Sequence, residues 1–343
     1  MKKINYFLFI VCAVTVLIRC NHSKNNEIKN DLDSSLVNTK HLDHLYTPIT
    51  FSSGVNAAGI YIYSEASDYH LVADNDEGFT CVDDVARAAL VYLRSKDFET
   101  DTAKQTKAVN LVRFILEMQS ANGYFYNFLF PKNTINTTGR TSVNEANWWS
   151  WRALQTLTEA TPLLQKINKE LTNKIKVAVK RLIQKIKSDL VNISVNTKVV
   201  KGVTVPLWLP YESATDQSAI IILGLIQYCK LNNDTIIINY IKKMADGIVM
   251  MQQGDSSHFP YSCFLSWENV WHAYGNMQAH ALFEAAAFFK DTIYSHKALD
   301  EVNNFYPWLL KMDSDLLLVF IKSQIILKQL MIKNMHRLLI YYL

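Results

Sequence analysis

The stretch from Gly78 to Leu90, "GFTCVDDVARAAL", places two adjacent carboxylates and an arginine at the start of an apolar, alanine-rich run. Thr80, followed three residues later by Asp83, predicts a capping box at the start of a helix. Successive helical side chains point about 100° apart, so we expect the two carboxylates to have different roles. Asp83 is assigned to the cap. Asp84 lies one turn before Arg87, which suits either an ion pair or a functional site.

This stretch begins the first of four similar segments. Each opens with polar or aromatic residues and continues as an apolar helix rich in small residues. Their starts lie about 60 residues apart, a spacing typical of a repeated two-helix unit. The four segments are "DDVARAALVYL" from Asp83, "NWWSWRALQTL" from Asn147, "DQSAIIILGLI" from Asp216 and "GNMQAHALFEA" from Gly275.

Amphipathic helices are predicted between these segments, at 103–119, 167–190 and 235–252. Two of them end alike, because "FILEMQSANGYFYNF" from Phe114 and "GIVMMQQGDSSHFPYS" from Gly247 both pass through Met and Gln to a turn and aromatic residues. Helices buried on most faces therefore alternate with helices that have one polar face. This alternation predicts an all-α fold, an (α/α) toroid with inner and outer helices.

"GFTCVDDVARAAL", followed by "SVNEANWWSWRALQTL", resembles the six-hairpin glycosidase superfamily, and within it bacterial members with a "GYCTDDNARAL"-type motif. The similarity covers residues 46–310. Val82, Val85 and Trp151 depart from the family pattern. The resemblance implies an (α/α)6 barrel. About four hairpins are recognisable, so we expect an incomplete ring.

The chain divides into four predicted regions. Lys2 and Lys3 precede a short apolar stretch that ends near Cys20. This arrangement resembles a bacterial lipoprotein signal in which Cys20 is the lipidated residue, although Arg19 departs from the pattern. An ordinary signal peptide or an uncleaved anchor is the alternative. The regions are a signal at 1–20, a disordered tether at 21–45, the toroid at 46–311 and an atypical tail, frameshifted or truncated, at 312–343.

Charge distribution and the spacing of cysteines and histidines indicate which classes of partner and cofactor to expect. The net charge is +4, and much of the basic excess lies on one amphipathic helix at 166–187, so we expect no nucleic-acid partner. Cys81, Cys229 and Cys263 form no disulfide or zinc pattern, and His272 and His280 lack a third ligand at a recognised spacing. We therefore expect no metal and no cofactor.

The loops that lead into the inner helices should meet at one end of the toroid. They combine carboxylates with aromatic side chains, which is the composition of a sugar cleft. The candidate catalytic residues are Asp84, Glu145, Glu212, Asp216 and Glu268. The candidate substrate-binding residues are Asp83, Arg87, Trp148, Trp149, Trp208, Tyr211, Trp267, Trp271, His272 and Tyr274.

Several of these residues have equally simple structural interpretations. The tryptophans between 148 and 151 suit a core as well as a sugar platform. Asp216 suits a helix cap. Glu268 and His272 have the spacing of an i,i+4 pair. The sequence does not select which carboxylate acts with Asp84.

The sequence thus predicts an exported protein of the bacterial cell envelope, lipid-anchored and facing the periplasm or the outside, that acts on an oligo- or polysaccharide. Hydrolysis by a carboxyl pair, of the inverting type, is the favoured reaction. A polysaccharide lyase or sugar epimerase, with His272 or Tyr274 as the base, is one alternative. A non-catalytic glycan-binding lipoprotein or an inactive remnant is the other.

Overall fold

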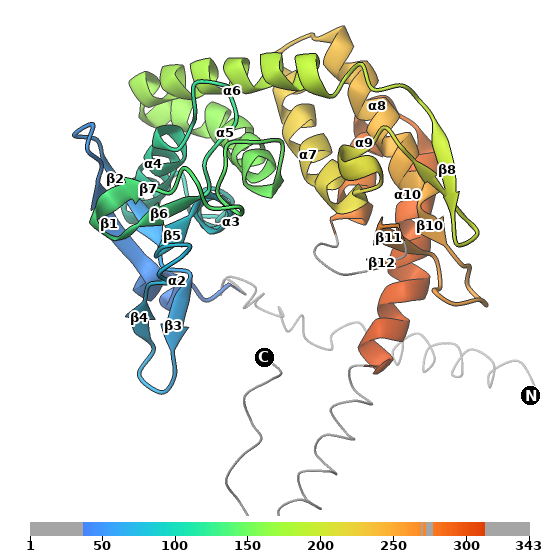
Figure 1. Ribbon diagram of the computed structural model, residues 1–343, viewed down its shortest axis with the longest axis horizontal. Coiled ribbons are helices and arrows are strands. Elements are labelled where there is room, and N and C mark those ends of the chain that lie inside the picture. Colours follow the sequence, from blue (N-terminus) through green and yellow to red (C-terminus); the bar gives the residue numbers. More distant parts are fainter. Residues whose placement is uncertain (1–36, 269, 272–276, 313–343) are drawn as a thin grey trace, which may run out of the picture. The chain divides into compact units, whose positions relative to one another are not determined.

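The computed structural model describes residues 37–268, 270–271 and 277–312 (Figure 1). The chain separates into two compact units, Met1–His44 and Leu45–Leu343. The described part of the first unit leads into a short helix, α2 (Lys40–Leu45). The segment expected to be a disordered tether therefore ends in a helix. Cys20 and the predicted tail from Asp313 onward lie outside the described residues.

The second unit contains four helical hairpins in its described residues, and in each an inner helix packs against the outer helix that follows it. This arrangement confirms the all-α fold with four recognisable hairpins. The pairs are α3 (Val82–Leu93) with α4 (Thr102–Glu117), α5 (Trp148–Ile167) with α6 (Lys169–Asp189), α7 (Thr215–Leu231) with α8 (Thr235–Met250), and α9 (Gln278–Phe289) with α10 (Thr292–Asp300). A π-helical turn, η3 (Glu301–Phe305), extends α10.

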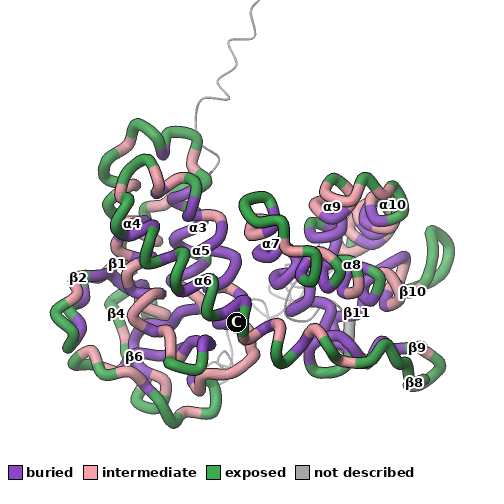
Figure 2. Tube along the Cα trace, turned by 90° about the horizontal axis from the view of Figure 1, so that it is seen from above, coloured by how far each residue is buried: buried purple, intermediate pink, exposed green. Residues whose placement is uncertain are grey.

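The inner helices pack side by side in chain order. α5 contacts both α3 and α7, and α7 also contacts α9. Every residue of α7 from Thr215 to Ile226 is buried, as its nearly continuous apolar sequence predicts. Outer helix α6 buries a single stripe and turns its lysines outward, and Figure 2 shows this contrast between buried inner helices and half-exposed outer ones.

The two matching Met-Gln turns have the same structural role. The side-chain amide of Gln119 donates to the Ala178 carbonyl of α6 at 2.9 Å, and that of Gln252 donates to the Lys297 carbonyl of α10 at 2.8 Å. Each glutamine therefore ties the end of one outer helix to the outer helix of the next hairpin. The repeated Met-Gln sequence therefore corresponds to a hydrogen bond that recurs between successive outer helices.

Short antiparallel strands lie in the loops between helices. The sheets are β1 (Tyr46–Thr50) with β2 (Asn56–Ile60), β3 (Tyr63–Glu65) with β4 (His70–Val72), β5 (Thr80–Cys81) with β6 (Phe128–Phe130) and β7 (Thr134–Ile135), β8 (Thr197–Val200) with β9 (Val203–Pro206), and β10 (Gln252–Gln253) with β11 (Cys263–Trp267) and β12 (Val270–Trp271). Within the part of the chain that the structure describes, no helix has the length and apolar character needed to cross a bilayer.

Candidate functional site

The motif that opens α3 is fixed by its loop neighbours. Gly78 has a φ of +113°, and a Cβ at this position would lie 2.2 Å from the Leu129 carbonyl oxygen, so the loop requires glycine. The hydroxyl of Thr80 accepts a hydrogen bond from the Ile60 amide at 3.0 Å. Thr80 therefore links the motif to strand β2.

The helix cap differs from the sequence prediction. Cys81 is the N-cap of α3, and its sulfur accepts from the Asp84 amide at 3.4 Å. The thiol also donates to Asp84 Oδ2, at 3.3 Å. The capping box predicted from Thr80 and Asp83 is therefore wrong by one residue, because the Thr80 hydroxyl is engaged by strand β2.

Asp83 instead faces two arginines. Its Oδ1 lies 3.3 Å from Arg87 Nε and 3.2 Å from Nε of Arg152 on α5. The predicted pair of Asp84 with Arg87 is present, with 2.9 Å between Asp84 Oδ1 and Arg87 Nη2. The two carboxylates thus share Arg87, contrary to the expectation of separate roles.

Burial acts on both members of the Asp83–Arg152 pair. It raises the pKa of Asp83, while the charges of Arg87 and Arg152 act in the opposite direction. It also lowers the pKa of Arg152, against the charge of Asp83. The Arg152 side chain is only 13% exposed, so its neighbours provide most of its charge compensation.

Asp216 is the most buried of the predicted catalytic carboxyl groups, at 1% exposure. It lies in the first turn of α7, but the N-cap of that helix is Ala214. Its Oδ1 accepts from the Gln217 amide at 2.7 Å, whereas Oδ2 has no hydrogen-bond partner among the described residues. Burial raises the pKa of Asp216 to about 7, and the Gln217 amide and the Arg152 charge act against this increase.

The first turns of neighbouring inner helices are joined by buried side chains. The indole N–H of Trp151 on α5 donates to Gln217 Oε1 on α7 at 2.8 Å. The amide of Gln278 on α9 donates to Thr215 Oγ1 on α7 at 3.2 Å. The expectation that these helix starts meet at one end is confirmed. We name the charged part of this end the helix-start cluster, which comprises Asp83, Asp84, Arg87, Arg152 and Asp216.

A second charged group lies in the loops before α7 and α9. Lys198 on β8 places its Nζ 2.8 Å from Glu212 Oε2 and 2.9 Å from Glu268 Oε2. The structure therefore brings two predicted catalytic carboxylates together through a lysine that sequence reasoning missed. Nothing in the local sequence marks Lys198, because Glu268, which joins it to the second loop, lies far away along the chain.

Glu145 lies before α5, where it accepts a hydrogen bond from the Asn147 side-chain amide at 2.9 Å. The hydroxyl of Tyr211 donates to the Ala146 carbonyl at 3.2 Å. Burial, together with the charge of Glu145, raises the pKa of Tyr211 to about 12. The loops before α5 and α7 therefore lie together.

Two of the aromatic residues predicted to bind substrate are not available to it. Trp149 and Trp208 are buried, and their indole N–H groups donate to the carbonyls of Phe125 and Lys243 at 2.7 and 2.8 Å. Both are core residues, and their assignment to substrate binding is wrong. Trp148 and Trp267 are partly exposed and remain candidates. The side chain of Trp271, and the residues His272 and Tyr274, lie outside the described residues.

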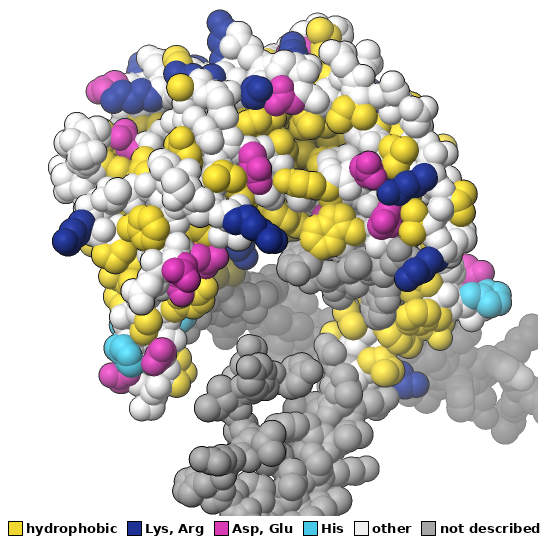
Figure 3. Space-filling model, in the orientation of Figure 1, with side chains coloured by type: hydrophobic (Ala, Val, Ile, Leu, Met, Phe, Trp, Pro, Cys, Tyr) yellow, Lys and Arg dark blue, Asp and Glu magenta, His cyan; other side chains and the backbone are white. Residues whose placement is uncertain are grey.

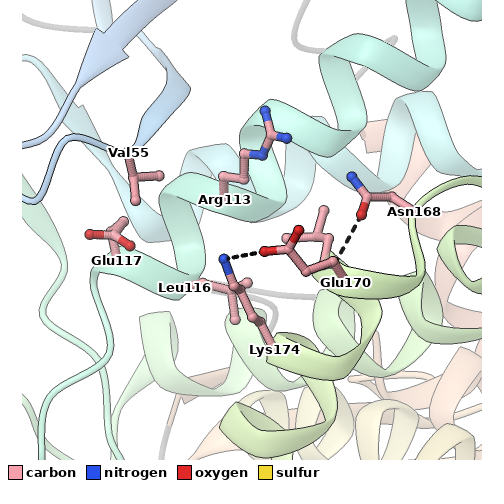
Figure 4. Close-up of a pocket in the computed structure, with 8 residues that line it drawn as sticks. Val55, Arg113, Leu116, Glu117, Asn168, Glu170 and Lys174 are labelled. Atoms are coloured by element: carbon pink, nitrogen blue, oxygen red, sulfur yellow. Dashed lines mark hydrogen bonds and ion pairs between the residues drawn. The ribbon is translucent and has the colours of Figure 1, made fainter.

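Two cavities lie away from these groups. One of about 90 Å³ lies between α4, α6 and the turn after β1, where the Glu170–Lys174 ion pair spans 3.0 Å (Figure 4). This volume is well below the roughly 300 Å³ of small ligand pockets. The other, of about 670 Å³, lies among the second half of α5, α6 and the end of α7. No candidate site residue lines either cavity.

Charges of both signs are mixed with apolar side chains on the face shown in Figure 3. In the described ranges, no group of three or more His, Cys, Asp or Glu side chains is placed to hold a metal ion. The side chains of the helix-start cluster itself are carboxyl and guanidinium groups.

Comparison with solved structures bears on the fold of the chain. No protein-family model and no curated protein sequence matches the chain. A GH76 α-mannanase from Bacteroides thetaiotaomicron matches its structure with a TM-score of 0.51 and 12% identity, covering 77% of this chain and 64% of that chain. This likeness supports the toroid fold, and the chain spans less than two thirds of that structure.

Two further glycoside hydrolases match less well. A family 76 enzyme from a bovine strain of Bacteroides thetaiotaomicron has a TM-score of 0.42 and 10% identity, covering 71% of this chain and 47% of its own. A thermostable endoglucanase from Alicyclobacillus acidocaldarius has a TM-score of 0.39 and 10% identity, covering 75% and 52%.

Asp83 and Asp84 should contribute differently to the free energy of unfolding. Asp83→Ala leaves Arg152 partly buried without its contacting carboxylate, so we expect a loss of about 2 to 4 kcal/mol in the free energy of unfolding. Asp84→Ala removes a more exposed ion pair and part of the cap, so about 1 kcal/mol is expected. Urea unfolding measures both. Equal losses would contradict the geometry, and Asp83→Ala with Arg152→Met is the control that should recover stability.

Asp216 should make stability depend on pH. An unfolded aspartate has a pKa near 3.9, so between about pH 4 and 7 the folded chain retains a proton that the unfolded chain has released. Its stabilising contribution is therefore complete below pH 4 and lost as the pH rises through about 7. Asp216→Asn should remove this slope, which amounts to roughly 2 to 4 kcal/mol between pH 4 and 8.

Chemical unfolding across that pH range measures the effect. Glu301, whose pKa burial also raises to about 7, should produce a parallel slope, and Glu301→Gln is the matched control for it. An unchanged slope in Asp216→Asn would show that this carboxyl group ionises as it does in the unfolded chain.

Proposed function

We propose that this chain is a carbohydrate-active protein that hydrolyses a glycosidic bond with a pair of carboxyl groups at the helix-start cluster. One observation carries the proposal: Asp216, a buried carboxyl group whose pKa burial raises to about 7, lies in the first turn of α7, at the same end of the inner helices as the Asp83–Arg152 pair. In such an environment, one carboxyl group can keep its proton at neutral pH while the neighbouring carboxyl groups are ionised.

The roles of proton donor and carboxylate are assigned from the protonation of Asp216 and from the exposure of Asp84. Glycoside hydrolysis needs one protonated carboxylic acid and one carboxylate that activates water or attacks the sugar. Asp216 is the proposed general acid. Its unpartnered Oδ2 is buried in this structure, so the residues that cover it would have to move before this atom could give a proton to the leaving oxygen. Asp84 is the proposed carboxylate, because its side chain is 30% exposed and Arg87 lies 2.9 Å away. In an inverting reaction, Asp84 would orient the attacking water.

The surrounding loops suit an oligo- or polysaccharide. The carboxylates of Glu145, Glu212 and Glu268 can accept hydrogen bonds from sugar hydroxyls, and the partly exposed rings of Trp148 and Trp267 can pack on apolar sugar faces. The structural neighbours are glycoside hydrolases, which supports this class of substrate.

The lyase or epimerase alternative stays a prediction. Those reactions need a side chain that abstracts a proton. The two bases predicted for it, His272 and Tyr274, lie outside the described residues. A non-catalytic glycan binder is the alternative that the assay below distinguishes.

We also propose export and lipid attachment at Cys20, from the signal-like start of the chain. Mass spectrometry of the mature N-terminus should find a lipid-modified cysteine. An unmodified Asn21, or an intact Met1, would contradict the proposal.

Hydrolysis is tested on a panel of α-mannans, β-glucans and xylans by release of reducing ends, between pH 4 and 9. Activity should fall as the pH rises through about 7, because Asp216 then loses the proton it donates. Asp216→Asn and Asp84→Asn should each reduce turnover by about 100-fold or more. Glu170→Gln, which alters an exposed pair on α6, is the control and should retain activity. Glycan binding without turnover in the unaltered protein would identify a binder.

A further inference from the structure

We propose that the larger cavity, of about 670 Å³, is a second ligand site that binds a small sugar carrying a carboxylate. The cavity lies among the second half of α5, the middle of α6 and the end of α7. None of the residues in its wall belongs to the helix-start cluster. The inference therefore goes beyond the proposed hydrolysis and does not rest on it.

The length of the inner helices separates this cavity from the helix-start cluster. α5 and α7 begin at the same end, as the hydrogen bond between Trp151 and Gln217 shows. The cavity is lined by the last turns of α7, from Tyr228 onward. At about 1.5 Å per residue, Tyr228 lies roughly 18 Å along α7 from Asp216. A ligand in the cavity would therefore be held apart from a glycan at the helix starts.

The wall of the cavity carries positive charge. Lys176 and Lys180 lie one turn apart on α6 and both line it, whereas no Asp or Glu of the described residues does. The Nζ atom of Lys176 lies 2.8 Å from the neutral side-chain oxygen of Gln165, which also lines the cavity. In the part of the chain that the structure describes, neither lysine forms an ion pair. A negatively charged ligand would supply the missing charge.

A carboxylate near this wall is already engaged. Asp234 accepts a hydrogen bond from the hydroxyl of the lining residue Tyr228 at 3.2 Å. The same carboxylate oxygen lies 2.7 Å from Lys187 Nζ, farther along α6. The charge of Asp234 is therefore largely compensated by Lys187, and the two lysines in the wall remain available to an anion.

The α5 side of the cavity offers hydrogen-bond acceptors. The hydroxyls of Thr158 and Thr161 donate to the carbonyls of Leu154 and Leu157 at 2.8 Å each, so both oxygens keep lone pairs that can accept. Pro162 lies inside the helix and has no N–H, so the Thr158 carbonyl lacks its usual helical donor. A ligand with several hydroxyl groups can donate to acceptors of this kind.

The size and the apolar part of the wall complete the match. A volume of about 670 Å³ falls within the roughly 300 to 1,000 Å³ of small-molecule sites. Pro162 and Leu231 add apolar surface. A sugar acid combines one carboxylate, several hydroxyl groups and an apolar ring face, and these are the groups that complement lysines, acceptor oxygens and aliphatic side chains.

The lysines also have a purely structural interpretation. Cations are favourable near the C-terminal ends of helices, and both α5 and α7 end near this cavity. In that case, replacing Lys180 would lower stability slightly, and the cavity would hold only water. Ligand binding therefore distinguishes the two interpretations, whereas stability does not.

Isothermal titration calorimetry on the full chain tests the proposal. The probe is a β-1,4-linked disaccharide of glucuronic acid and glucose, and cellobiose is its neutral match. The acidic disaccharide should bind about 10-fold more tightly than cellobiose, and Lys180→Gln should remove this preference. Lys174→Gln is the matched control, because Lys174 lies on the same helix but pairs with Glu170 away from this cavity, and it should leave binding unchanged.

A second variant tests the hydroxyl contacts. Thr161→Val keeps the shape of the side chain and removes an acceptor, so it should weaken both disaccharides by about 3- to 10-fold. Lys180 is exposed, so its replacement should leave the melting temperature nearly unchanged and binding can be compared directly.

Several results would overturn the proposal. These are no saturable binding of the acidic disaccharide, equal affinity for cellobiose, or unchanged affinity in Lys180→Gln. Inorganic phosphate that displaces the acidic disaccharide with higher affinity would show a site for charge alone and would also overturn it. Absence of glycan hydrolysis, with this binding intact, would reject the proposed function and retain the second site.

Discussion

The close packing of α5 against α7 is the constraint on which the rest of the described fold depends. Gly224 allows the approach, since any side chain at this position would meet the backbone of Gln155. The Trp151–Gln217 hydrogen bond fixes the same two helices near their starts. With α5 also contacting α3, and α7 contacting α9, this central pair positions all four inner helices.

Close packing of the inner helices buries most of Arg152 and nearly all of Asp216 at the helix starts, and this has chemical consequences. The charged groups there must compensate one another, as Asp83, Arg87 and Arg152 do. Among the described residues, Asp216 has no hydrogen-bond partner for Oδ2, and its burial raises its pKa. A carboxyl group held in this way weakens the fold at neutral pH, which is the kind of local conflict that functional sites accumulate.

The loops contribute a more open set of groups around this buried centre. The β8–β9 hairpin brings Lys198 to Glu212 and Glu268, and the loop before α5 brings Glu145 near Tyr211. Buried inner helices thus supply a candidate proton donor, and partly exposed loops supply groups suited to sugar hydroxyls. This division agrees with the general tendency of rigid elements to position chemistry while loops provide recognition.

Local patterns in the sequence determined the helices, their pairing into hairpins and the Asp84–Arg87 contact, because all of these depend on residues within a few turns of one another. The repeated Met-Gln turns were visible for the same reason. The cap at Cys81, the core positions of Trp149 and Trp208, and the roles of Arg152 and Lys198 were decided only by the tertiary structure. Each of these depends on a partner far away in the chain: Ile60 engages Thr80, Asp83 meets Arg152, and Lys198 meets Glu268. Sequence spacing within one helix carries no information about a partner on the next, so packing alone determines which carboxyl group is buried beside which charge.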